Sequence, residues 1–125
     1  MNGLKVGLVG CGRNALMSHA PNRVRISHAK LTAFCDAAPS AALSAARKFG
    51  VSHTYEDLAA MVSRESLDIV DICTPPELHE SQVVQALEGG CNVLVEKPMS
   101  LDVRGADNMI RASERAGRYL FVVAQ

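Results

Sequence analysis

The chain has 125 residues, of which 48% are apolar, and this size supports one globular core but not two. Its 13 basic and 13 acidic residues cancel to a formal charge of zero, so it lacks the basic excess that binds nucleic acid or anionic membranes. Only 4% of the residues are aromatic, which argues against a surface that stacks unpaired bases.

Short apolar runs, rich in branched residues, predict strands that are buried on both faces of a sheet. In chain order these runs cover residues 4–10, 30–35, 67–73, 92–95 and 119–124, with a weaker run at 52–55. Patterns of helical period separate them. The first predicted helix opens directly after the first strand, and the later ones cover residues 40–49, 56–62, 77–88 and 101–116. In the last helix we expect Ser100 as N-cap, with Ala106, Met109 and Ile110 facing the core.

This alternation of strand and helix predicts an α/β fold. The expected architecture is a doubly wound, mostly parallel six-stranded sheet with helices on both faces, the Rossmann fold. Such sheets bind ligands at the carboxyl ends of their strands, at the point where the strand order reverses. We therefore predict a single dinucleotide-binding domain over residues 1–125.

A glycine-rich turn, G-x-G-x-x-A, directly follows the first predicted strand and opens the first helix. Gly10 permits a tight turn, Gly12 lets the backbone approach a pyrophosphate, and Ala15 is small enough for close packing of helix and strand. The amides of the helix N-terminus then face the phosphates. The alternative is a tight turn without a ligand. The predicted phosphate-binding residues are Gly10, Cys11, Gly12, Arg13, Asn14 and Ala15.

Asp36 ends the second predicted strand, at the separation from the glycines where an acid accepts hydrogen bonds from an adenosine ribose. Its carboxylate should repel a 2′-phosphate, and the alanine pair that follows offers no arginine to compensate. NAD is therefore preferred over NADP, although Arg13 and Arg47 could still reach the pocket. A different role, as a helix-capping residue ahead of Pro39, stays open.

Two further turns lie at the same edge of the predicted sheet. Residues 74–79, TPPELH, follow the fourth strand, and residues 96–98, EKP, follow the fifth. A lysine directly after a buried strand can contact a nicotinamide or a substrate, as a hydrogen-bond donor or as an acid/base group. The alternative for Lys97 is a solvated loop residue paired with Glu96.

The four cysteines are far apart and form no C-x-x-C pair. They are Cys11, Cys35, Cys73 and Cys91. We therefore predict no metal site, and we expect free thiols in a reducing compartment, the cytoplasm. The first apolar run is too short for a signal peptide or a membrane span, so we expect no membrane partner.

Four stretches in this order, GLVGCGRNA, LTAFCD, LDIVDICTPPELH and ALEGGCNVLVEKP, resemble the Gfo/Idh/MocA oxidoreductases over essentially the whole chain. The TPP-x-x-H and EKP stretches are more specific than the glycines. Members of that family are typically NAD(P)-dependent dehydrogenases acting on sugars, inositols and related polyols. They join an N-terminal Rossmann domain to a largely antiparallel C-terminal domain, which forms the substrate pocket and much of the oligomer interface.

The resemblance implies that Lys97 is the catalytic lysine, which assists hydride transfer beside the nicotinamide. It also makes the Lys97–Pro98 bond a candidate for the cis form. Ala15 in place of a third glycine is a tolerated departure. The remaining residues that the resemblance assigns to the cofactor are Thr74, Pro75, Pro76, His79 and Glu96.

The family's second catalytic pair, an Asp-x-x-x-His in the C-terminal domain, has no counterpart after Lys97. We therefore expect the substrate domain to be absent from this chain, which would bind NAD without turning over a polyol. A sugar or polyol substrate would bind through the missing domain. The apolar surface that this domain would cover favours self-association into a homo-oligomer.

Other functions fit the residues less well. A non-catalytic NAD-binding or sensory module is the main alternative, and a methyltransferase shares the glycine turn and the acid but requires neither EKP nor TPP-x-x-H. Short-chain dehydrogenases need Tyr-x-x-x-Lys, which neither Tyr55 nor Tyr119 provides. A P-loop would need Gly-Lys-Ser/Thr. His19, His28 and His53 lack metal-ligand spacing, so we interpret them as structural or solvated.

Overall fold

The computed structural model describes residues 3–124. Strand and helix alternate along this part of the chain as predicted, and the weak run at 52–55 forms a strand of its own, β3. No helix in the described range is both long and apolar enough to cross a membrane. The elements are β1 (Leu4–Val9), η1 (Ala15–His19), α1 (Ala20–Arg25), β2 (Ala29–Cys35), α2 (Pro39–Phe49), β3 (His53–Tyr55), α3 (Leu58–Glu65), β4 (Ile69–Ile72), η2 (Pro76–Leu78), α4 (His79–Glu88), β5 (Asn92–Val95), α5 (Val103–Ala116) and β6 (Leu120–Val122).

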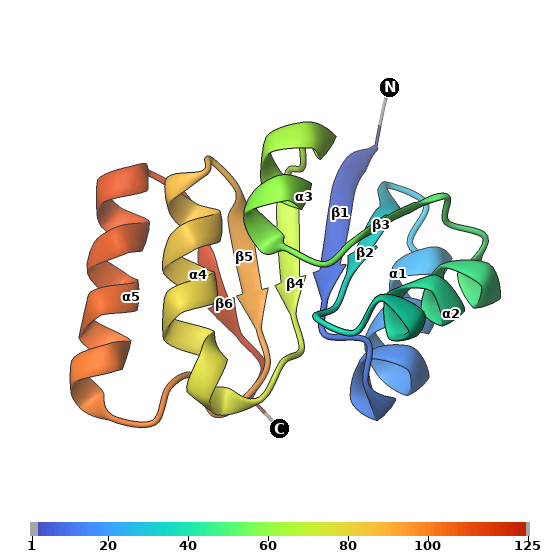
Figure 1. The fold of residues 1–125 in the computed structure, drawn as a ribbon. Helices are drawn as coiled ribbons and strands as arrows, with labels where there is room; N and C mark the ends of the chain where they lie inside the picture. Colours follow the sequence, from blue (N-terminus) through green and yellow to red (C-terminus); the bar gives the residue numbers. More distant parts are fainter. Residues whose placement is uncertain (1–2, 125) are drawn as a thin grey trace.

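The six strands form one parallel sheet in the order β3-β2-β1-β4-β5-β6. The first three strands add outward from β1 through β2 to β3. The last three add on the other side of β1, from β4 through β5 to β6. This confirms the doubly wound fold, whose order reverses between β1 and β4. The carboxyl ends of β1, β4 and β5 meet at the lower edge in Figure 1, so every predicted site turn lies at that edge.

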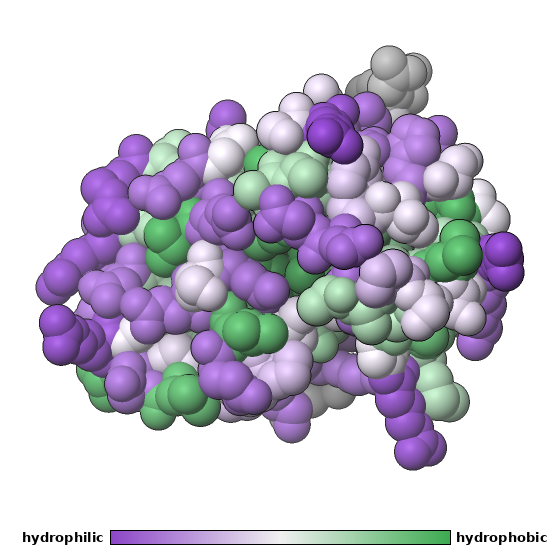
Figure 2. All heavy atoms as spheres, in the orientation of Figure 1, coloured by the Kyte–Doolittle hydropathy of each residue, from purple (hydrophilic) through white to green (hydrophobic). Residues whose placement is uncertain are grey.

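Helices cover both faces of the sheet (Figure 1), and each face has its own core. On one face α3, α4 and α5 bury large side chains such as Met61, Leu87 and Met109. On the other, η1, α1 and α2 cover Leu8 and Phe34 with a surface rich in alanine. Each large apolar side chain that is fully buried stabilises the fold by about 1.5–3 kcal/mol. The outer surface of α4 and α5 is mostly hydrophilic (Figure 2).

In the part of the chain that the structure describes, no helix covers one part of the second face. Beside α1, the strands β4, β5 and β6 leave an apolar groove of about 390 Å³. Tyr119 and Phe121 stack their rings 5.8 Å apart there, and they are 71% and 56% exposed. The apolar run at 119–124 predicts a strand buried on both faces. Within residues 3–124 no strand pairs with the outer side of β6, which is instead an edge strand with exposed side chains.

The start of the last helix differs from the prediction. Asp102, not Ser100, is the N-cap, and its carboxylate accepts a hydrogen bond from the amide of Gly105 at 2.7 Å. Ser100 lies two residues earlier, where its hydroxyl bonds to the backbone of Asp102. Both residue types cap helices well, so the choice depends on where the backbone turns.

The buried face of α5 also differs from the prediction in one residue. Met109 is fully buried, as expected, and Ala112 joins it. Ile110, which the apolar pattern predicts to face the core, is 45% exposed. The buried residues Gly105, Met109 and Ala112 are spaced by four and three positions and so share one face of the helix, whereas Ile110, one residue after Met109, is rotated by about 100° from that face.

Candidate cofactor site

β1 ends in a turn that requires glycine at its first position. Gly10 has a φ of +89°, and a Cβ on it would lie 2.8 Å from the amide nitrogen of Thr74. Gly12 is the opposite case, because a Cβ there would meet no atom within 4 Å. The chain therefore packs tightly at Gly10 and leaves open space at Gly12, where a ligand could approach the backbone.

The helix after this turn leaves amides without helical acceptors. Leu16 donates to the carbonyl of Gly12 at 3.1 Å, so the amides of residues 13–15 precede the first hydrogen bond of the helix. Ala15 is buried against the sheet, which brings the helix close to β1. Together these features form the amide-lined start of a helix that binds an anion such as a pyrophosphate.

Cys11 differs from its neighbours in the turn. Its side chain is 7% exposed, and burial raises the pKa of its thiol to about 12. Its amide donates to Oδ2 of Asp36 at 2.8 Å, so this amide is already engaged within the protein. The side chain of Cys11 therefore lies in the wall behind the turn, and its contact with phosphate stays a prediction.

Asp36 lies directly after β2 and connects three segments. Its Oδ2 accepts from Cys11, its Oδ1 accepts from the amide of Ala38 at 2.9 Å, and its own amide donates to Tyr55 at 3.0 Å. The bond to Ala38 supports the turn into α2, and this resembles the alternative role of Asp36 as a helix-capping residue ahead of Pro39. Each carboxylate oxygen keeps a lone pair for a ribose hydroxyl, so the two roles are compatible.

An open cleft of about 730 Å³ lies between these turns, and it is bordered by β1, β2 and the start of α4. Five of the predicted residues line it: Gly10, Gly12, Asp36, Thr74 and Pro75. Residues that the sequence reasoning missed also line it, among them Glu56, Asp57, Leu78 and Gln82. Gln82 lies in the first turn of α4 and accepts a hydrogen bond from the hydroxyl of Thr74 at 2.6 Å, and no local spacing in the sequence indicates this contact.

His79 does not line the cleft. It is completely buried, its Nδ1 lies 2.8 Å from the carbonyl oxygen of Pro98, and its Nε2 lies 2.7 Å from that of Thr74. The ring therefore joins the turn after β4 to the turn after β5 from behind. In this position His79 supports the turns that face the cleft, and its contact with the cofactor stays a prediction. Pro76, which begins η2, is also absent from the lining.

The EKP turn lies at the other end of the same edge. Lys97 is exposed, and its peptide bond to Pro98 is cis, as predicted. Within residues 3–124 its ammonium group forms no ion pair, so the alternative of a Lys97–Glu96 pair is not observed. Glu96 instead accepts a hydrogen bond from the side chain of Asn14. This contact connects the EKP turn with the glycine turn.

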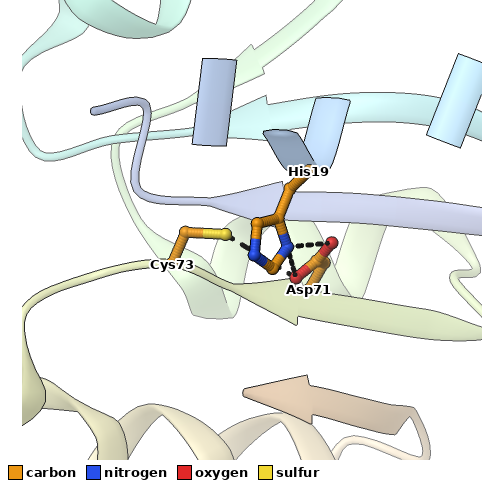
Figure 3. A group of neighbouring side chains, drawn as sticks. All are labelled: His19, Asp71 and Cys73. Carbon is orange, nitrogen blue, oxygen red and sulfur yellow. Dashed lines mark hydrogen bonds and ion pairs between the residues drawn. The ribbon is translucent and has the colours of Figure 1, made fainter. Parts of the chain in front are cut away.

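A buried polar cluster lies under η1 on the second face of the sheet (Figure 3). His19 Nδ1 lies 2.9 and 3.0 Å from the two carboxylate oxygens of Asp71, and Arg23 Nε donates to the same carboxylate at 3.2 Å. Cys73 approaches it with its thiol at 3.6 Å, and burial raises the pKa of that thiol. The hydrogen bond to Asp71 raises the pKa of His19; burial opposes this rise and Glu96 adds to it.

Three of these side chains could in principle bind a metal, because donor atoms of His19, Asp71 and Cys73 lie within 4.8 Å of one another. However, both oxygens of Asp71 already have protein partners, and one partner is the cationic Arg23. A further cation would be repelled there, so we interpret the cluster as an ion-pair network. His19 therefore takes part in an ion-pair network with the buried Asp71.

Comparison with known proteins agrees with this geometry. Residues 4–124 match the sequence model of the Gfo/Idh/MocA group, described as "Oxidoreductase family, NAD-binding Rossmann fold". Among curated proteins, the chain is 40% identical over 121 residues to a D-apiose dehydrogenase from Paraburkholderia graminis, covering 94% of this chain and 31% of the relative. The chain spans about a third of the length of the curated relatives that it matches.

Solved structures match over nearly the whole chain. One is the WlbA dehydrogenase from Bordetella pertussis in complex with NADH and UDP-GlcNAcA, with a TM-score of 0.92, 31% identity, and coverage of 98% of this chain and 37% of that one. Another is scyllo-inositol dehydrogenase from Lactobacillus casei with bound NAD(H) and scyllo-inositol. It matches with a TM-score of 0.89 and 31% identity, covering 97% of this chain and 36% of that one.

Proposed function

Because the chain belongs to the Gfo/Idh/MocA oxidoreductase family and matches the NAD-binding Rossmann fold of that family, we propose that it binds NAD. The binding site is the cleft at the carboxyl ends of β1, β2 and β4. One observation carries this proposal: Gly12, which has open space in place of a side chain, and Asp36 line the same cleft, and the amides that precede the first helical hydrogen bond follow Gly12 directly. A pyrophosphate would lie against the amides, and the adjoining ribose would lie against Asp36.

The same carboxylate supports a preference for NAD over NADP. A 2′-phosphate on the ribose would bring its charge next to Asp36, whose Oδ1 and Oδ2 are fixed by the amides of Ala38 and Cys11. The carboxylate cannot turn away without breaking both hydrogen bonds. We therefore infer that NADP binds more weakly, because of charge repulsion at this position.

For the whole protein we propose hydride transfer between the nicotinamide and a sugar, inositol or related polyol. A bound NAD supplies the site that accepts or donates the hydride. Lys97 supplies an exposed ammonium group beside it, which would donate a hydrogen bond to the reacting oxygen of the substrate and exchange a proton with it. Glu96, held by Asn14, orients the turn that carries this lysine.

We also propose that a second domain, outside residues 1–125, selects the substrate. The apolar groove beside β6 supports this, because a surface that exposes Tyr119, Phe121 and Leu4 favours contact with further protein. The same surface supports self-association of the isolated chain into a homo-oligomer. Sedimentation at several concentrations tests this, and a strictly monomeric result would remove the idea. The free cysteines support the cytoplasm as the compartment.

Calorimetry with the purified chain tests cofactor binding. We expect binding of NADH and of ADP-ribose, weaker binding of NADPH, and none of S-adenosylmethionine. Binding of S-adenosylmethionine in place of NADH would support the methyltransferase alternative and overturn the proposal. A longer chain that binds NADH yet oxidises no polyol would support a non-catalytic NAD-binding module instead.

A further inference from the structure

Asp71 is a charged residue in the middle of a buried strand. It is fully buried, and a carboxylate in this position is costly unless other groups compensate its charge. His19 from η1 and Arg23 from α1 compensate this charge: Nδ1 of His19 lies against both carboxylate oxygens, and Nε of Arg23 donates to Oδ2. The ring of His19 is therefore hydrogen-bonded to a residue of a central strand, because β4, which carries Asp71, lies between β1 and β5 in the sheet.

The second nitrogen of this ring faces the EKP turn. With Nδ1 hydrogen-bonded to Asp71, Nε2 lies 3.6 Å from Oε1 of Glu96. When Nε2 carries a proton, it attracts the carboxylate of Glu96. When it does not, a lone pair faces the same carboxylate, and the attraction is lost. The other groups that face the ring are Arg23 from α1 and Cys73, which follows β4.

Glu96 is the point where three parts of the site meet. Besides His19, it accepts from the side chain of Asn14 in the glycine turn and from the backbone amide of Lys97 at 3.3 Å. A polar cavity of about 190 Å³ opens beside it, lined in part by Asn14, His19 and Asn22. Glu96 is only 18% exposed, so its charge is incompletely screened by solvent.

We propose that His19 is a positioning residue for the nicotinamide end of the site, and that its proton sets the preference between oxidised and reduced cofactor. The protonated ring holds Glu96 and neutralises its charge. Loss of the Nε2 proton leaves Glu96 with an uncompensated negative charge. This inference rests on the proposed function, in which the EKP turn borders the nicotinamide.

The direction of the effect follows from the charge of the cofactor. The oxidised nicotinamide ring carries a positive charge and the reduced ring is neutral, whereas the ADP-ribose portion is the same in both. Deprotonation of His19 should therefore favour NAD⁺ over NADH. The ratio of the two dissociation constants, NAD⁺ to NADH, should fall as the pH rises through the titration of His19, by on the order of three- to tenfold.

The experiment measures this ratio in the purified chain from pH 5.5 to 9, with ADP-ribose as a reference ligand that lacks the nicotinamide. NMR titration of the imidazole signals gives the pKa of His19 in the same samples. We expect the ratio to change across that pKa in the wild type and to be constant in His19→Gln and Glu96→Gln. His28→Gln is the matched control, because His28 is exposed and lies before β2; it should behave as the wild type.

The outcomes separate the two claims. If ADP-ribose and NADH both fail to bind, the proposed function is wrong and this inference falls with it. If both bind, but the ratio is flat across the titration of His19, or changes equally in His19→Gln, the inference alone is overturned. Should His19→Gln fail to fold, the wild-type titration and Glu96→Gln still decide the matter, since Glu96 lies in a surface turn.

Discussion

The carboxylate of Asp36 accepts a hydrogen bond from the backbone amide of Cys11, at 2.8 Å. These residues lie 25 positions apart and follow the ends of the neighbouring strands β1 and β2, so the bond fixes the expected ribose site relative to the glycine turn. The two parts of the fingerprint therefore form one structural unit. A change in the carboxylate should affect both the ribose contact and the turn itself.

For Asp36→Asn we expect weaker NADH binding, by roughly tenfold or more, because a hydrogen bond to a charged group contributes about 1.5–3 kcal/mol. NADPH binding should weaken less or improve, because the repulsion with the 2′-phosphate is removed. Calorimetry with both cofactors measures the change in selectivity. Asp107→Asn, on the exposed side of α5, serves as a control. An unchanged ratio of the two affinities would contradict the ribose assignment.

The two glycines of the turn should respond differently to substitution. Gly12→Val should leave the free energy of unfolding nearly unchanged, because a Cβ there meets no atom within 4 Å, but should abolish measurable NADH binding. Gly10→Ala should destabilise the fold by about 1–3 kcal/mol, because of its positive φ and its contact with Thr74. Urea unfolding and calorimetry on both variants test this. Full cofactor binding by a stable Gly12→Val chain would be incompatible with the proposed site.

The His19–Asp71 pair should make stability depend on pH. Since folding raises the pKa of His19, its contribution is fully present below its unfolded pKa of about 6.5 and is lost as the pH rises through the folded pKa. His19→Gln should therefore cost most at acidic pH, by about 1–3 kcal/mol, and progressively less in alkaline solution. Urea unfolding at several pH values measures this. A cost that grows with pH would mean that the sign is wrong.

Packing of α5 gives a test that is independent of the cofactor. Met109→Ala should destabilise the fold by about 2–5 kcal/mol, because the side chain is completely buried. Ile110→Ala, its neighbour in sequence, should cost less than about 1 kcal/mol, since that side chain is 45% exposed. Thermal unfolding of the two variants compares them directly. Equal losses would show that α5 is rotated relative to the described packing.

The sequence predicted the order and type of the elements because each buried strand is a short apolar run bounded by polar or glycine residues. It was less accurate for α5. The hydropathy of Ile110 favoured an inward position, whereas the buried face of α5 runs through Gly105, Met109 and Ala112. Neighbouring residues that cap equally well, Ser100 and Asp102, also cannot be distinguished without the path of the backbone.

The candidate site was predicted in its motifs but not in its internal contacts. The glycine turn, Asp36 and the EKP turn are local signals in the sequence, and they follow the strands β1, β2 and β5 of one parallel sheet. His19 and Asp71 are 52 residues apart, so no local spacing connects them. One signal did exist: a carboxylate at Asp71 interrupts an apolar strand, and a buried charge requires a partner. This argument predicts that Asp71 has a cationic partner, but it does not predict that His19 is one of its partners.

The imidazole of His79 makes the turns after β4 and β5 mechanically dependent on each other, since it contacts the carbonyl of Thr74 and that of Pro98 while hidden from solvent. Exchange of these loops with a relative should therefore succeed only when both turns and His79 are replaced together. In a chimera that imported one segment alone, we expect one of the two backbone carbonyls to lie out of hydrogen-bonding distance of the His79 ring. Recombination libraries built from this chain should place their crossover points outside residues 74–98.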